Sequence, residues 1–444
     1  MNGITQICAA LTLFLLPSTL IAANQPAEID QLAPELQAIL SSAHKKAPDL
    51  IKQTFIKEEA DARLKQAKAA YYPSLHVINN LGYRKDYREE DSENTDKFGL
   101  TYSAALRRPL YHWGAIEAQI EQARLNNDSD KLNYLSNLQK IERRIRADYL
   151  SLILNNIALH NEQAKQSVLK ARSKTNQINF QAGKVSELDY KKSRIALEKS
   201  LLEMERIAQS QERIAERFQY YAGWNAPTTQ STEIPKVDID ATEAWLQEQY
   251  NQIDSSSWIY QTHRAKLHSN KIAHQEEAIT RIKAQKRPLI DASLTASQNQ
   301  SNTSNRNNVD TFSVFGGIRV SWNIFDGFKT RNQTIEAQTK VRRLEHEFRK
   351  LSKELQLEAR EVLDALLFQV RSLKLNEAQL KTKQDEYALM EDSALNGRIT
   401  QLELQDAALS LKNETFNLHK ARAEFHIGLS DYLDLVSPIY QSSL

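Results

Sequence analysis

The chain has 444 residues, of which 26% are charged, and its 58 Lys and Arg nearly balance its 56 Asp and Glu to give a net charge of +2. Such a balance provides no large basic field, so nucleic-acid binding is not expected. Its 11 Gly and 10 Pro are well below the roughly 7% and 5% of average proteins, which favours long uninterrupted helices.

An apolar run occupies residues 7–23, ends in small residues and gives way to polar sequence at Asn24. This order is typical of a cleaved secretory signal and predicts a signal peptide over residues 1–23, although residues 1–6 lack the usual Lys or Arg. The run is too short to span a membrane as a helix; the alternative is a buried N-terminal helix. Because Cys8 is the only cysteine, removal of the signal leaves a mature chain without disulfides or thiol chemistry.

The mature chain begins with a predicted helix and two predicted strands. Residues 49–72 contain no Gly or Pro, and Pro73 follows them, which predicts a helix that ends at the proline. Residues 74–83 and 98–108 then alternate apolar with small or polar side chains, a pattern that predicts strands. A strongly charged connector separates these two strands.

A very long helix and a shorter one follow the strands. Residues 115–182 are free of Gly and Pro, so they predict one helix of roughly 100 Å at 1.5 Å per residue. Helices of this length are typical of coiled-coil packing. Gly183 is typical of the residue that ends a helix, and Ser186 is typical of the N-cap of the next one. The segment therefore predicts a long antiparallel helical hairpin.

The second half of the chain repeats the first at a fixed offset. Tyr111–Gly114 matches Phe325–Phe328, and Gly183 matches Gly397. The two matches have the same offset in residue number (325 − 111 = 214 and 397 − 183 = 214). A constant spacing of this kind indicates a tandem duplication. We predict repeat 1 over residues 27–225, a linker over residues 226–241, and repeat 2 over residues 242–437 with strands at 289–298 and 312–322 and a long helix at 328–396.

The four predicted strands have the length and the pattern of strands that cross a membrane. Each is about ten residues long, which is what a tilted strand needs to cross a bilayer. One face of each is apolar, as in Phe312, Val314 and Ile318, and such alternation is typical of outer-membrane barrels. Four strands cannot close a barrel by themselves, so several chains would have to contribute. A soluble sandwich or an edge hairpin is the alternative, and the very long helices argue against it.

The order of these segments resembles the TolC-type outer-membrane factors. The resemblance rests on the helix, the Pro-led strand pair, the segment Pro109–Gly114, the very long helix, the turn Gly183–Leu188 and the second copy, and it covers essentially the whole mature chain. It implies a mostly α fold with a small β part. Long helical hairpins in tandem repeat would form a periplasmic α-barrel, and four strands per chain would contribute to a trimeric, twelve-stranded outer-membrane β-barrel. The second copy departs from the pattern at Trp322–Gly327, where no Pro precedes the turn.

The resemblance also implies a function and partners. The chain would form a homotrimer in outer-membrane lipid, with a large periplasmic portion, and would be the exit duct of a tripartite efflux pump or of a type I secretion system. A periplasmic adaptor (membrane fusion) protein and an inner-membrane pump or ABC transporter would be its partners, and nucleic acid would not.

The residues that match the family's adaptor-docking tips lie at the two turns. They would contact the adaptor, and they are Gly183, Lys184, Val185, Ser186, Leu188, Gly397, Arg398, Ile399, Thr400 and Leu402. A purely structural role for these turns is the alternative.

The residues that match the family's periplasmic gate are Glu403 and Asp406. They lie six and nine positions after Gly397 (403 − 397 and 406 − 397), as does the acidic pair that narrows the tunnel in the family, and they share one helix face. In a trimer they would form a ring of carboxylates that selects cations. An ordinary solvated acidic pair is the alternative, and Glu403 is one methylene longer than the Asp usual at its position.

No catalytic constellation is present in the sequence. It contains no Gly-rich phosphate loop, no nucleophile elbow and no HExxH motif, so we expect no enzymatic activity, cofactor or metal site. The alternative function is that of a soluble periplasmic coiled-coil adaptor or scaffold protein, which would not need two alternating strand pairs.

Overall fold

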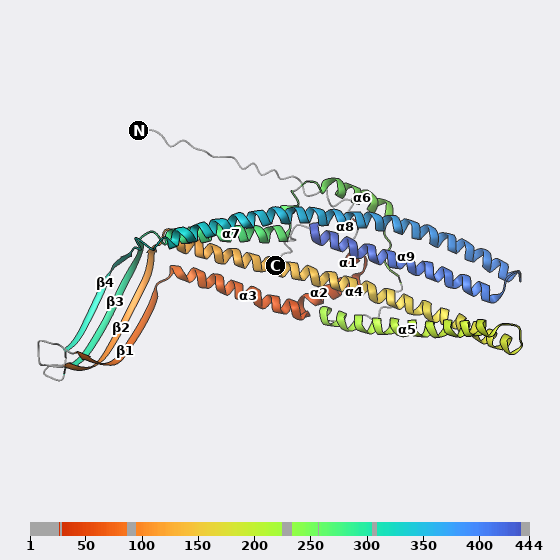
Figure 1. Ribbon diagram of the computed structural model, residues 1–444, viewed down its shortest axis with the longest axis horizontal. Helices are drawn as coiled ribbons and strands as arrows, with labels where there is room; N and C mark the ends of the chain where they lie inside the picture. Colours follow the sequence, from red (N-terminus) through yellow and green to blue (C-terminus); the bar gives the residue numbers. More distant parts are fainter. Residues whose placement is uncertain are drawn as a thin grey trace, which may run out of the picture. The chain divides into compact units, whose positions relative to one another are not determined.

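The computed structural model describes residue 26 and residues 29–86, 95–223, 233–255, 257–303 and 309–436 (Figure 1). The signal peptide predicted over residues 1–23 lies outside these residues. The helices, in chain order, are α1 (Ile29–Leu32), α2 (Pro34–Lys46), α3 (Pro48–Lys68), α4 (Ala115–Gln181), α5 (Glu187–Ala222), α6 (Ile239–Gln252), α7 (His263–Ala284), α8 (Lys329–Leu395) and α9 (Gln401–Val436). The strands are β1 (Ser74–Asp86), β2 (Thr95–Tyr111), β3 (Leu289–Thr303) and β4 (Val309–Ser321).

The long helices confirm the mostly α fold predicted from the scarcity of Gly and Pro. Helices α4 and α8 have 67 residues each, and α5 and α9 have 36 each. Helix α8 begins 214 residues after α4 begins (329 − 115), and α9 begins 214 residues after α5 begins (401 − 187). The offset of the sequence motifs is therefore also the offset of the helix boundaries. The structure adds α1, α2, α6 and α7 to the helices predicted above.

The chain divides into two compact units that do not coincide with the two sequence repeats. Unit 1 comprises residues 1–47, 141–255 and 358–435, and unit 2 comprises residues 48–140, 256–357 and 436–444. Each unit contains parts of both halves of the chain, because α4 and α8 contribute to both units. The duplicated halves are thus interleaved in packing.

One four-stranded antiparallel sheet, in the order β1-β2-β3-β4, forms part of unit 2. Its register places Val77 opposite Ala104, Ala104 opposite Ala296 and Ala296 opposite Val314, and residues opposite each other lie on the same face. That face is mostly apolar, with Asn79 and Gln298 among its polar exceptions, and its apolar side chains are Leu75, Val77, Leu81, Tyr83, Leu100, Tyr102, Ala104, Leu106, Ile290, Ala292, Leu294, Ala296, Phe312, Val314, Ile318 and Val320. The other face is mostly polar or small.

All four strands extend beyond the residues that alternation predicts. They have 13, 17, 15 and 13 residues, whereas the prediction gave about ten each. The pairing continues because backbone hydrogen bonds do not depend on side-chain polarity. Apolar alternation stops where the connectors become polar, so it marks only the part of each strand whose apolar face is maintained.

Two matching turns lead from the sheet into the long helices. Trp113 and Gly114 have φ of 55° and 80°, and Gly327 and Phe328 have φ of 64° and 67°. The left-handed conformation is unfavourable for residues other than Gly, so the duplicated turns keep the same backbone although Gly occupies different positions. Asp291, whose side chain is fully buried, accepts hydrogen bonds from Arg107 and from His112 at 2.9 Å and fixes this end of the sheet.

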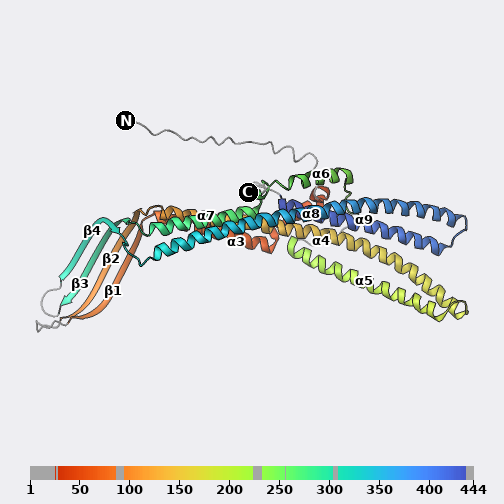
Figure 2. The same cartoon turned by 45° about the horizontal axis from the view of Figure 1, so that its top comes forward.

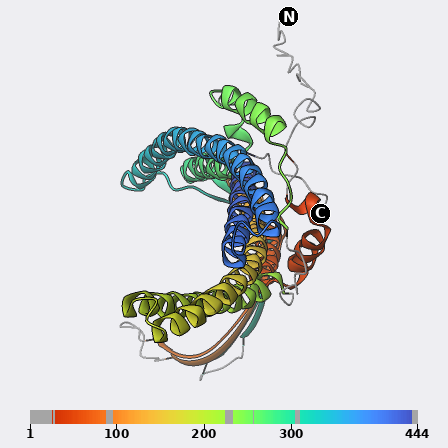
Figure 3. The same ribbon diagram turned by 90° about the vertical axis from the view of Figure 1, so that its right-hand side faces the viewer.

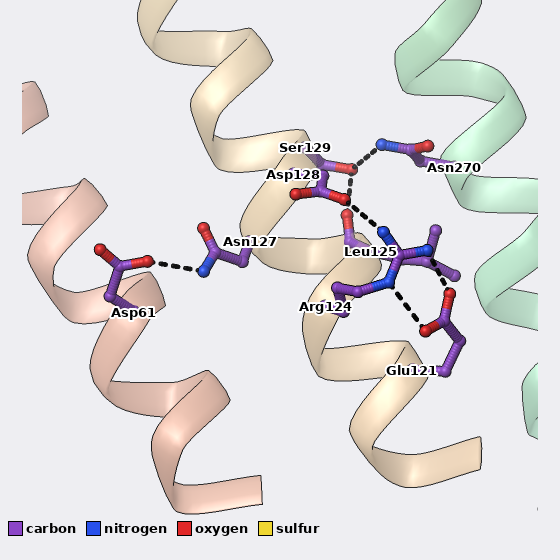
Figure 4. A network of polar contacts seen from close by, with 8 residues as sticks. All are labelled: Asp61, Glu121, Arg124, Leu125, Asn127, Asp128, Ser129 and Asn270. Atoms are coloured by element: carbon purple, nitrogen blue, oxygen red, sulfur yellow. Dashed lines mark hydrogen bonds and ion pairs between the residues drawn. The ribbon is translucent and has the colours of Figure 1, made fainter. Parts of the chain in front are cut away.

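A polar network joins three helices of unit 2 (Figure 4). The Asn127 amide on α4 donates to Asp61 of α3 at 2.7 Å, and Asn270 of α7 donates to Ser129 of α4 at 3.2 Å. Asn127 is buried, and the hydrogen bond of its amide nitrogen offsets part of the cost of desolvating this side chain. The network therefore fixes α3 and α7 against α4.

In unit 1 the helices lie side by side in the order α5-α4-α9-α8 (Figures 1 and 2). Polar contacts join each neighbouring pair. Asn155 of α4 donates to Ser210 of α5 at 3.2 Å, Asn161 of α4 donates to the Lys412 carbonyl of α9 at 3.2 Å, and Arg422 of α9 pairs with Glu377 of α8 at 3.0 Å. Helices α5 and α8 are consequently the two edges of this layer.

An extended segment over residues 233–238 lies against α9 of unit 1. The backbone N–H of Ile234 donates to Nδ1 of His419 at 3.2 Å, and Nε2 of His426 donates to the Pro235 carbonyl at 3.3 Å. Ile234 is buried, as are both histidines. Two histidines one heptad apart thus attach part of the predicted linker to the second helical hairpin.

Candidate functional site: the turns of the two helical hairpins

The two hairpin turns have the same backbone structure. Gly183 and Gly397 adopt φ of 69° and 66°, and a bond from Lys184 N–H to the Asn179 carbonyl at 2.8 Å matches one from Arg398 N–H to Ser393 at 2.9 Å. These are the bonds of a Schellman motif, in which a left-handed Gly lets a helix end while its last carbonyls stay bonded. Figure 3 views the molecule from the side of these turns.

Most of the predicted docking residues are exposed at these turns. Gly183, Lys184, Ser186, Leu188, Gly397, Arg398 and Thr400 are exposed, and Val185, Ile399 and Leu402 are half-buried. The structure therefore places all ten on two accessible surfaces. Whether they dock a partner stays a prediction.

The two tips differ in the side chains next to the turn. Phe180 and Tyr190 stack with ring centroids 5.7 Å apart in the first hairpin. The equivalent positions of the second hairpin hold Ala394 and Leu404. The duplicated hairpins therefore present one aromatic and one aliphatic tip, so a partner would meet two chemically distinct surfaces.

The N-cap predicted at Ser186 is confirmed, and Thr400 is the equivalent cap of the second hairpin. Oγ of Ser186 accepts from Asp189 N–H at 3.1 Å. In the second hairpin, Oγ1 of Thr400 accepts from Glu403 N–H at 3.3 Å, and the Glu403 carboxylate accepts from Thr400 N–H at 2.7 Å. This reciprocal pair is a capping box. The backbone and hydroxyl donors of Thr400 lower the pKa of Glu403, because they stabilise its carboxylate.

Asp406 lies on the same helix one turn further on and has a different partner. Its carboxylate pairs with Arg172 of α4, so the ion pair joins the two hairpins. The side chains are 37% exposed for Arg172 and 47% exposed for Asp406. The predicted acidic pair thus consists of one carboxylate that caps α9 and one that connects α9 to α4.

Residue types that bind metals are scattered over the described part of the chain. No three His, Cys, Asp or Glu side chains within it are grouped so that they could hold a metal ion. The polar residues at the turns instead form caps and ion pairs between helices.

Comparison with known families identifies the chain. The family described as outer membrane efflux protein matches residues 39–223 and 271–429, which is more than half of the sequence. The chain belongs to that family. This efflux protein is therefore not an enzyme, and it serves as an outer-membrane exit duct with a large periplasmic helical portion. Family membership decides against the soluble adaptor or scaffold considered as the alternative.

Solved outer-membrane channels share the fold of this efflux protein. It is similar to the Campylobacter jejuni CmeC outer membrane channel, with a TM-score of 0.73 and 12% identity over 90% of this chain and 85% of that one. It also resembles the Vibrio cholerae outer membrane protein VceC, with a TM-score of 0.69 and 14% identity over 93% and 99%, and the Neisseria gonorrhoeae MtrE outer membrane channel, with a TM-score of 0.67 and 13% identity over 93% and 90%. No curated protein matches the sequence significantly.

The helices of the efflux protein contain many charged residues. Within the described residues, none is both long enough and apolar enough to cross a membrane.

Proposed function

We propose that three copies of this efflux protein assemble into a closed conduit, with the two sequence repeats, residues 27–225 and 242–437, as its building elements. Twelve strands would form the outer-membrane barrel, and the hairpins would form a periplasmic α-barrel whose tips receive an adaptor protein linked to an inner-membrane pump. The observation that carries this proposal is that, among the described residues, the two outer strands of the sheet are unpaired on one side and the two edge helices of the layer carry exposed apolar side chains.

The sheet supports assembly because it is open and has two unlike faces. Strands β1 and β4 have no neighbour on their outer side among the described residues. Exposed edge strands pair readily with other strands. The apolar face carries exposed side chains such as Val77, Phe312 and Ile318, which are 65%, 68% and 67% exposed. Pairing of β4 of one copy with β1 of the next would close the sheet with its apolar face toward lipid.

The helical layer supports assembly because both edge helices carry apolar stripes with heptad spacing. Leu188, Ile195 and Leu202 of α5 are 61%, 51% and 66% exposed. Ile195 and Leu202 lie two positions after the buried Ser193 and Ser200, which is about 200° around the helix at 100° per residue. The exposed stripe therefore faces away from the buried one.

Helix α8 repeats this arrangement at the other edge of the layer. Phe368, Leu375 and Leu389 are 73%, 60% and 72% exposed, whereas Leu366 and Leu373, two positions before the first two, are buried. Phe368 and Leu375 are seven residues apart and Leu389 is fourteen further on, and apolar residues at multiples of seven on an outward face are typical of a coiled-coil seam. We infer that α8 of one copy packs against α5 of the next.

Cysteine crosslinking tests this seam in a Cys8→Ser background, in which the introduced cysteines are the only ones. Ile195 lies eight residues after the start of α5 and Leu389 six residues before the end of α8, so at 1.5 Å per residue both lie about 10 Å from the turns. Ile195→Cys with Leu389→Cys is expected to give disulfide-linked dimers and trimers on oxidation.

The matched control for the crosslink is Arg194→Cys with Ala388→Cys. Both control positions are exposed, and each is one residue, or about 100°, away from its test position. This pair is expected to remain monomeric on a denaturing gel. Equal crosslinking of the test pair and the control pair would contradict the seam. So would the absence of crosslinks from both pairs in a preparation that is trimeric by light scattering.

We propose that the acidic pair on α9 forms the gate of this conduit. Three copies would bring six carboxylates from Glu403 and Asp406 toward the tunnel axis, where a ring of like charges selects cations. Replacing both residues by Ala is expected to raise single-channel conductance in planar bilayers. Unchanged conductance would remove the gate role and leave the conduit intact.

We propose that the adaptor contacts the exposed turns of both hairpins. Leu188 of the first turn and Arg398 of the second are both exposed, so each offers a side chain that a partner could contact directly. Leu188→Glu or Arg398→Glu is expected to reduce adaptor recovery in crosslinked preparations, while Arg194→Glu, which changes charge away from the turn, is not. Full adaptor recovery with both tip variants would contradict docking at the tips.

A further inference from the structure

A basic groove lies where the sheet of unit 2 meets its helices. It has a volume of about 290 Å³ and is lined by Lys283 of α7, by Lys286 just beyond α7, and by Thr330, Arg331, Thr334 and Ile335 in the first two turns of α8. We call it the junction groove. It lies between two helices that the sequence separates by a whole strand pair, and no part of the hairpin site belongs to it.

The charge of the junction groove is unusual for this chain. Residues 281–287 and 322–335 contain six Lys or Arg and one acidic residue, Asp326, whereas the whole chain has a net charge of only +2. Among the described residues, the structure shows no salt bridge for Lys283, Lys286 or Arg331. Three exposed cations that face one groove repel each other, so an anion bound there would be stabilised.

The nearby acidic residue, Asp326, offsets only part of the positive charge of this groove, because one carboxylate stands against three Lys and Arg side chains. The Asp326 carboxylate accepts from Thr330 N–H at 2.9 Å and also from the Thr330 hydroxyl, so it caps the start of α8. These bonds, together with the charge of Lys286, lower the pKa of Asp326. Because the cap already occupies the helix N-terminus, any anion affinity of the groove must come from its Lys and Arg side chains.

An exposed apolar segment adjoins the groove on the side of the sheet. Trp322, Phe325 and Phe328 are 58%, 72% and 58% exposed. The Trp322 indole donates to the Lys286 carbonyl at 2.9 Å, which ties the aromatic segment to the basic one. Aromatic residues beside Lys and Arg are typical of the interface between lipid and water.

The position of the groove along the chain sets its depth in the membrane. Lys286 lies three residues before β3 begins at Leu289, and Trp322 directly follows the end of β4 at Ser321. With the strands in the outer membrane and the helices in the periplasm, these ends lie at the headgroups of the periplasmic leaflet. Basic clusters at this depth bind anionic headgroups.

We propose that the junction groove binds the phosphate of an anionic phospholipid, with the acyl chains along the aromatic segment and the apolar face of the sheet. This inference rests on the membrane placement of the sheet given under the proposed function. Lys283, Lys286 and Arg331 supply charge-assisted hydrogen bonds to the phosphate oxygens. A zwitterionic lipid brings its own ammonium group among these cations and is disfavoured, so the groove selects phosphatidylglycerol over phosphatidylcholine.

Native mass spectrometry of the delipidated trimer tests the proposal with phosphatidylglycerol and phosphatidylcholine of identical acyl chains. We expect the wild type to bind phosphatidylglycerol more tightly. Basic residues near a membrane surface each contribute about a fivefold factor in affinity for anionic lipid, so Lys283→Gln with Lys286→Gln and Arg331→Gln is expected to abolish the preference. The control Arg371→Gln with Lys381→Gln and Lys412→Gln removes the same charge from helices of unit 1 and is expected to keep it.

Three results would overturn the proposal. The first is equal binding of the two lipids by the wild type, or a preference that survives in the groove variant. The second is loss of the preference in millimolar inorganic phosphate, which would assign the groove to a free anion. The third is protection of Lys283 and Lys286 from acetylation in the lipid-free trimer, which would show that a neighbouring copy covers the groove.

The planar-bilayer conductance of the same preparations separates this inference from the proposed function. A wild type that conducts but shows no lipid preference contradicts only the groove. A wild type that neither forms trimers nor conducts contradicts the conduit itself.

Discussion

Replacing Arg172 by Gln isolates the ion pair that joins the two hairpins. The change leaves Asp406 and Glu403 in place, so the charge of the proposed gate is retained while the link from α9 to α4 is lost. If the link holds the tips together, the variant opens more readily than the wild type. Arg194 provides the control, because its partner Glu198, at 3.4 Å, lies on the same helix.

The size of the effect follows from the exposure of the pair. With side chains 37% and 47% exposed, solvent screens the interaction, and exposed ion pairs contribute about 0.2–1 kcal/mol each. Three equivalent pairs in a trimer would contribute about 0.6–3 kcal/mol, because each copy supplies one. At 1.4 kcal/mol per factor of ten, the ratio of open to closed states would rise between about threefold and about 150-fold.

Single-channel recording in planar bilayers measures this ratio directly. Arg172→Gln is expected to increase the open fraction or the conductance, Arg194→Gln is expected to change neither, and Arg172→Asp with Asp406→Arg is expected to restore the closed state by reversing the pair. If Arg172→Gln behaves like the wild type, or if the reversed pair stays open, the reasoning is refuted.

Two further outcomes test the packing of unit 1. Burial and the charge of Arg422 lower the pKa of His419, and burial is also the main cause of the lowered pKa of His426. In the unfolded chain both histidines have a pKa near 6.5, so below that pH the unfolded chain binds more protons than the folded one. Folding stability therefore falls as the pH drops below about 6.5. The apparent unfolding temperature should therefore decrease between pH 7 and pH 5, and His419→Gln with His426→Gln should flatten that decrease; an unaltered slope would contradict the attachment of residues 233–238. Gly223→Ala should lower the unfolding temperature more than Gly183→Ala. A Cβ at Gly223 would lie 2.5 Å from Cβ of Lys46, whereas a Cβ at Gly183 would meet nothing within 4 Å. Equal effects would show that both changes in stability come from the left-handed φ alone, which costs about 1–2 kcal/mol.

The long helices and their turns could be predicted because their signals are local. The absence of Gly and Pro over residues 115–182, followed by Gly183 and the cap Ser186, specifies one helix, one left-handed residue and the next helix start. The strands were predicted too short, since their ends pair through the backbone with polar side chains. Local patterns thus give the elements but not the full extent of their pairing.

The contacts between hairpins could not be predicted from the sequence. Arg172 and Asp406 are 234 residues apart, and a single Arg among many exposed charges carries no signal of its partner. The junction groove is similar, since Lys283 and Arg331 become neighbours only through the packing of α7 beside α8. The division into two interleaved units is also invisible in the repeat, because α4 and α8 each belong to both units.

The most direct test of the conduit is the assembly and conductance of the purified protein. Detergent extracts of the outer membrane should yield a heat-resistant particle with three times the mass of the mature chain by light scattering, and this particle should open ion channels in planar bilayers. A soluble periplasmic monomer that produces no conductance would contradict the account.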